Sequence, residues 1–171
     1  LITVFTPISG AHFNPAVTLA MAIQRSLSVS QALLYVLAQF TGAVCGVIAA
    51  HAMFALPLFQ TSAHARGTFG ESLAEVIATF GLVLTIQLSS RAPISQIAAA
   101  VALWITAAYW FTSSTSFANP AVSFARSLTD TFSGISPDHV PSFIVSQLIG
   151  ALLAVLAGRW LAHGAERQGE R

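Results

Sequence analysis

The stretches "SGAHFNPAVTLA" (residues 9–20) and "TSFANPAVSFAR" (residues 115–126) decide the fold, because Asn-Pro-Ala-Val occurs twice in an otherwise apolar chain. Asn is a favoured N-cap and Pro is favoured at the first helical position, so each motif predicts a helix that begins there. About ten residues follow each motif, to Gln24 and to Thr129, which gives a helix about 15 Å long. Because a bilayer core is about 30 Å thick, two such helices meeting end to end would span it once.

The composition indicates a membrane protein. Of the 171 residues, 55% are hydrophobic and 8% are charged, and the chain contains no lysine. A soluble domain carries about 25% charged residues, so the sequence predicts an all-α membrane protein. The net charge of +1 excludes a nucleic-acid partner, because no basic stripe is present to neutralise phosphates.

Four segments are apolar enough to be predicted as membrane spans: 29–54, 73–88, 97–111 and 143–162. The segment from Leu1 to Ile8 is predicted to be the end of a further span. Since residue 1 falls inside an apolar run and no initiator Met is present, we expect an N-terminal truncation.

The chain also reads as an internal duplication. The motif asparagines are 105 positions apart (119 minus 14), and a Gln-x-x-Gly-Ala pattern recurs at 39–43 and 147–151. Three predicted spans separate Asn14 from Asn119, and an odd number of crossings places the two copies in opposite orientations. The sequence therefore predicts a partial first repeat at 1–69, with a half-helix at 14–24, and a second repeat at 70–171, with a half-helix at 119–129.

These motifs, together with Ser-Gly-Ala-His at 9–12 and Glu75 in "AEVIATFG", resemble the aquaporin and aquaglyceroporin (major intrinsic protein) family, in a bacterial-type form. The resemblance implies six spans around two re-entrant half-helices, one pore per protomer, a homotetramer and a place in the bacterial inner membrane. Against this pattern the chain lacks the first span and most of the second. The resemblance also implies that the matching Glu75 supports the backbone of a pore loop.

The facing helix ends predict the physical basis of a pore. Each helix N-terminus carries about half a positive charge, so two of them at the midplane repel cations and protons and leave neutral solutes free to pass. We expect Asn14 and Asn119 to point their side-chain NH2 groups into the pore while their carbonyl oxygens bind backbone. The alternative for a single motif is a turn with a capped surface helix, whereas two motifs in an inverted repeat favour the pore. The predicted midplane residues are Asn14, Pro15, Ala16, Asn119, Pro120 and Ala121.

The resemblance further implies a narrow filter nearer the outside of the membrane. Its residues stand twelve and three positions before the second motif Asn and three positions after it, which gives Ala107, Ser116 and Val122; a fourth, from the second span, is not in this sequence. The family pattern has Arg where this chain has Val122. A wider, less polar constriction is therefore predicted, open to glycerol, urea or metalloid hydroxides such as arsenite as well as water.

Two polar residues, Arg126 and His12, each allow two interpretations. Arg126 lies seven residues beyond Asn119, on nearly the same helix face, and either lines the outer vestibule or pairs with Asp130 at i+4. His12 either lines the inner vestibule or is a packed, hydrogen-bonded loop residue. The family's orientation would put five arginines inside and two outside, in agreement with the positive-inside rule; the inner set is Arg25, Arg91, Arg159, Arg167 and Arg171, and the outer set is Arg66 and Arg126.

The predicted function is a passive transmembrane channel for water and small neutral solutes. The alternatives are an inverted-repeat secondary transporter, which also uses broken helices, or a non-conducting membrane protein if the natural chain lacks the missing spans. No nucleophile with an adjacent base and no carboxylate pair is present, so no enzyme is expected. The histidines have no partners at metal-ligand spacing, and we expect no metal site and no cofactor.

Overall fold

The structure is a computed structural model that describes residues 1–169, and every regular element in that range is helical. Arg171 lies outside the described residues, and the side chain of Arg167 is not described. The all-α prediction is confirmed for the described part. The elements are α1 (Ile2–Ser9), α2 (Pro15–Ile23), α3 (Val29–Met53), α4 (Phe69–Leu88), α5 (Ile94–Phe111), α6 (Pro120–Arg126), the 3-10 helix η1 (Pro137–His139) and α7 (Val140–Gly169).

Four helical segments are long and apolar enough to cross a membrane: Val29–Met53, Phe69–Leu88, Ile94–Phe111 and Pro137–Ala162. This confirms a multi-pass membrane protein. Helix α4 begins four residues before the predicted span because Thr68 and Glu71 form a capping box that extends the helix past its apolar part. Helix α6 ends at Arg126, three residues before the predicted end, because the amides of Ser127 and Leu128 bond carbonyls only three residues back.

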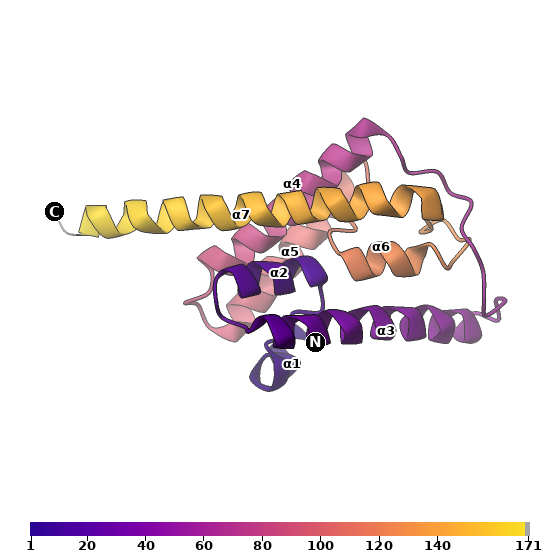
Figure 1. The fold of residues 1–171 in the computed structure, drawn as a ribbon, viewed down its shortest axis with the longest axis horizontal. Helices are drawn as coiled ribbons and strands as arrows, with labels where there is room; N and C mark the ends of the chain where they lie inside the picture. The colour runs from indigo at the N-terminus through magenta and orange to yellow at the C-terminus, as the bar shows by residue number, and fades with distance from the viewer. Residues whose placement is uncertain (170–171) are drawn as a thin grey trace.

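The two short helices lie end to end in the middle of the molecule. Figure 1 shows α2 and α6 with their N-terminal ends facing each other and their axes running in opposite directions. The long helices α3 and α7 run antiparallel on either side of this pair (Figure 1). Both short helices pack against both long ones, so the arrangement of α2 on α3 and α7 is repeated by α6 on α7 and α3.

The closest helix packing joins α4 to α7, and small residues make it possible. The fully buried Ala78 lies in one core cluster with Ala151 and Ala154 of α7. Gly150 of α7 lies directly against the α4 backbone, so that a Cβ built on it would overlap the Val76 carbonyl oxygen. Its repeat equivalent, Gly42 of α3, has open space at the same position.

Replacing Gly150 with Ala should therefore destabilise the protein by about 1–3 kcal/mol, the usual cost of overpacking a core. The matched variant Gly42→Ala should be neutral or slightly stabilising, since Ala is favoured over Gly in a helix by up to about 1 kcal/mol. Thermal unfolding of both variants in one detergent measures the difference. Equal shifts of the two unfolding temperatures would contradict the close α4–α7 packing.

Candidate functional site

The loops that enter α2 and α6 share an unusual backbone conformation. Residues four, three and one positions before each motif Asn have positive φ: 71°, 50° and 47° in the first loop, and 61°, 50° and 48° in the second. Only one of the six, Gly10, is a glycine, and a left-handed conformation costs other residues about 1–2 kcal/mol each. The surroundings must therefore hold both loops in place. The six residues are Gly10, Ala11, Phe13, Thr115, Ser116 and Ala118.

Reciprocal hydrogen bonds join the two loops. Asn14 Nδ2 donates to the carbonyl oxygen of Ala118 at 2.7 Å, and Asn119 Nδ2 donates to that of Phe13 at 2.9 Å. Each asparagine thus binds the residue directly before the other asparagine. These bonds place the N-termini of α2 and α6 against each other in the middle of the bundle.

The side-chain oxygens of both asparagines cap their own helices. Asn14 Oδ1 accepts from Ala16 N at 2.8 Å, and Asn119 Oδ1 accepts from Ala121 N at 3.0 Å and Val122 N at 3.3 Å. The sequence analysis expects both NH2 groups to point into the pore; in the structure one N–H of each donates to the opposite loop, which leaves the second N–H of each group. The side chain of Asn14 is buried and that of Asn119 is half-buried, so Asn119 is the more accessible donor. The remaining motif residues, Pro15, Ala16, Pro120 and Ala121, are buried.

Glu75 supports the second loop from α4. Its fully buried carboxylate accepts four hydrogen bonds: from Ser114 Oγ at 2.6 Å, the amides of Phe117 and Ala118 at 2.8 Å each, and Gln147 Nε2 at 2.6 Å. A buried carboxylate is costly unless its oxygens are satisfied. Here every partner is a donor, and two of them are backbone amides of the strained loop.

The repeated glutamines have a role that the sequence analysis missed. Gln147 of α7 also donates to Ser123 Oγ at 2.7 Å, and Gln39 of α3 donates to Thr18 Oγ1 at 2.9 Å. Thr18 and Ser123 stand at the same place, four residues after each motif Asn. Each glutamine thus ties a long helix to a short one. The signal in the sequence was a polar residue at equivalent places in two apolar spans.

His12 lies beside the first motif. It is half-buried, and its Nδ1 lies 3.2 Å from Thr18 Oγ1. It also lines a cavity of about 490 Å³ that reaches from both asparagines along α4 and α5. The wall opposite the motifs is apolar and includes Leu82, Ile86, Val101 and Ile105.

The structure brings only one of the three predicted filter residues to the cavities that lie along α3 and α6. Val122 is half-buried and lines two of them, one of about 730 Å³ shared with Asn119 and one of about 630 Å³ shared with Arg126. Ala107 is exposed on α5 and Ser116 is buried, and neither lines these two cavities. Within the described residues the Ser116 hydroxyl has no hydrogen-bond partner.

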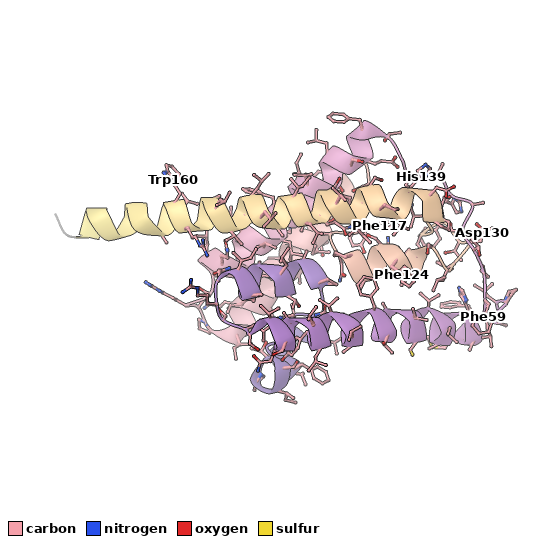
Figure 2. All side chains as sticks on the ribbon, in the orientation of Figure 1. Phe59, Phe117, Phe124, Asp130, His139 and Trp160 are labelled. Carbon is pink, nitrogen blue, oxygen red and sulfur yellow. The ribbon has the colours of Figure 1, made fainter. Side chains whose placement is uncertain are left out.

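Arg126 contacts aromatic residues and not Asp130. Its Cζ lies 4.1 Å from the centroid of the Phe117 ring, and its Nη2 lies 3.4 Å from the Tyr109 hydroxyl. Asp130 Oδ1 accepts instead from Ala63 N at 2.9 Å. In Figure 2, Phe117 lies beside the N-terminal part of α7, close to α6, and Asp130 lies at the end of the molecule where the loops gather.

Comparison with known proteins agrees with this geometry. The sequence model of the major intrinsic protein family matches residues 1–93. The chain is 48% identical over 165 residues to aquaglyceroporin AqpS of Rhizobium meliloti (strain 1021), a match that covers 96% of this chain and 71% of AqpS.

More distant relatives include aquaporin-5 of Rattus norvegicus, with 32% identity over 163 residues, and aquaporin PIP2-1 of Arabidopsis thaliana, with 42% identity over 91 residues. These matches cover 88% and 46% of this chain, and 60% and 30% of the respective relatives. The chain belongs to the major intrinsic protein family, which includes the aquaporins and aquaglyceroporins.

Proposed function

We propose that this chain forms a passive transmembrane channel for water and small neutral solutes. The pair of reciprocal Asn–carbonyl hydrogen bonds supports the proposal most directly, because it fixes two opposed helix N-termini at one point of the bundle. Each N-terminus carries about half a positive charge. Both partial charges repel a cation at that point, whereas they do not repel a neutral solute.

A solute passing the motifs would lose hydration and need partners. The half-buried Asn119 keeps one N–H that the opposite loop does not use, and this group can donate to a solute oxygen. The apolar wall formed by Leu82, Val101 and Ile105 offers the solute no hydrogen bond. Because hydrogen-bond donors lie on one side of the path and apolar side chains on the other, a small polar molecule can pass without binding tightly.

Glycerol, urea and metalloid hydroxides such as arsenite are the proposed solutes beside water. Where the family's filter pattern has an arginine, this chain has Val122, which is smaller and uncharged. Pore diameter and lining donors decide selectivity in such channels. The relative AqpS is named an aquaglyceroporin, which is consistent with a solute larger than water.

We also propose that the chain consists of two repeats, at 1–69 and 70–171, and that it forms a homotetramer in the bacterial inner membrane. The helix pairings of α2 and α6 with α3 and α7 support the repeats. Helix α3 buries only His51 and α5 only Ala108, so lipid or neighbouring protomers would cover most of these two apolar helices. Native mass spectrometry of the protein, extracted from the membranes in which it is expressed, would show whether four copies associate.

Stopped-flow light scattering on vesicles tests the conduction. Vesicles containing the complete gene product should swell faster than empty vesicles under an inward glycerol gradient, which measures glycerol entry. They should also shrink faster under an impermeant osmolyte, which measures water exit. An inward arsenite gradient is applied in parallel. Vesicles no faster than empty ones for any solute would refute the channel. Flux that saturates and requires a proton or sodium gradient would favour the secondary transporter.

A further inference from the structure

Val122 stands where the family's filter pattern has an arginine, and the cavity that it lines is also lined by a nearby arginine, Arg126. Val122, Ala125, Arg126 and Thr129 line this cavity of about 630 Å³ together. Positions 122 and 126 are one helical turn apart on the same face of α6, which is about 6 Å along the helix axis. A guanidinium therefore stands one turn beyond the position where this chain has a valine.

The Arg126 side chain is held but not neutralised. The Phe117 ring lies under its guanidinium at 4.1 Å, an arrangement that stabilises a cation without cancelling its charge. The nearest acidic residue in sequence, Asp130, bonds Ala63 N instead, and the carboxylate of Glu75 is occupied by four donors. Among the described residues no carboxylate forms an ion pair with Arg126.

A second arginine shares the same ring. Arg66, from the loop between α3 and α4, lies with its Cζ 5.3 Å from the Phe117 centroid. Its guanidinium donates to the carbonyl oxygens of Gly134 at 2.8 Å, Phe132 at 3.0 Å and Ser114 at 3.4 Å. Burial and the nearby positive charge of Arg126 lower the pKa of Arg66. Arg66 thus holds loops together, whereas within the described part of the chain the N–H groups of Arg126 have only the long contact with Tyr109.

We propose that Arg126 supplies the cation-excluding charge of the outer pore, one helical turn outward from the filter position where Val122 supplies none. The inference rests on the proposed channel function. The midplane helix ends then act as a second barrier in series. Separating charge from constriction in this way keeps the filter wide for neutral solutes while cations meet a fixed positive charge before they reach it.

Electrical recording on the complete gene product in planar bilayers, with glycerol flux measured on vesicles from the same preparation, tests this proposal. In Arg126→Gln the ratio of potassium conductance to glycerol flux should rise about tenfold, the size of effect that loss of one nearby unit charge produces. Arg126→Lys should keep the low ratio of the original protein. Adding Val122→Arg to Arg126→Gln should lower the raised potassium conductance itself again, and for this double variant the conductance is compared directly because Val122→Arg also reduces glycerol flux.

A matched control is Arg91→Gln, which removes the same charge from the turn between α4 and α5 and should leave the ratio unchanged. If Arg126→Gln does not reach the membrane, Arg126→Met, which is uncharged and still covers the Phe117 ring, replaces it. An unchanged ratio in the uncharged variant, or an equal rise in Arg126→Lys, would overturn the proposal. Absence of glycerol flux in the unsubstituted protein would instead refute the channel function itself.

Discussion

Replacing Glu75 with leucine is expected to destabilise the folded protein strongly. The four donors around the carboxylate lose their acceptor at once. The Ser114 hydroxyl can rotate and Gln147 retains its bond to Ser123, but the amides of Phe117 and Ala118 are fixed by the loop's backbone. Each buried, unsatisfied donor costs about 1–3 kcal/mol, so the two amides alone remove about 2–6 kcal/mol from a typical total of about 5–15 kcal/mol.

The unfolding temperature in detergent measures this loss, and a fall of at least about 5 °C is expected. The matched control is Glu71→Gln, one turn earlier on α4. It removes a carboxylate from the same helix but keeps the capping box with Thr68, since Gln serves at that position as well as Glu. A Glu75→Leu variant as stable as Glu71→Gln would show that the carboxylate does not hold the loop.

The sequence predicted the elements of the fold because they depend on local properties. Apolar length located the spans, and Asn followed by Pro located the starts of α2 and α6. The start of α4 was predicted four residues too late because only the apolar segment was counted, and the first turn of this helix also contains the polar residues of its cap. Glu71 lies within the first turn of α4, where an acidic side chain bonds the helix N-terminus, so a charge there does not end a helix.

The contacts of the site could be predicted only in part, since they join residues far apart in the chain. The i+4 spacing suggested Asp130 as a partner for Arg126, but Ala63, 67 positions from Asp130, offers a free backbone N–H. Phe117 then receives the guanidinium. Likewise the motifs predicted helix caps, which are local, and missed the bonds from Asn14 to Ala118 and from Asn119 to Phe13, which need both loops in place.

Replacing Val122 with arginine should reduce the passage of glycerol much more than that of water. Val122 is half-buried and lines the cavities on both sides of its position on α6. A guanidinium there occupies space that a glycerol molecule would use, and a steric mismatch of about one methylene in a narrow site costs about 1–3 kcal/mol. Because about 1.4 kcal/mol corresponds to a tenfold change in rate, glycerol flux should fall about 10- to 100-fold. Water is smaller and its flux should fall much less.

Stopped-flow measurements of glycerol and water flux on the same vesicles give the ratio that decides the point. Val122→Leu adds only one methylene and no charge or donor, so its ratio should stay within about threefold of the original. Because α6 is fixed by hydrogen bonds of Asn119, Ser123 and Gln147, none of which involves the Val122 side chain, both variants should fold. A glycerol-to-water ratio unaltered in Val122→Arg would place the size-selective constriction elsewhere along the path, and the preference for larger solutes could then no longer be attributed to this valine.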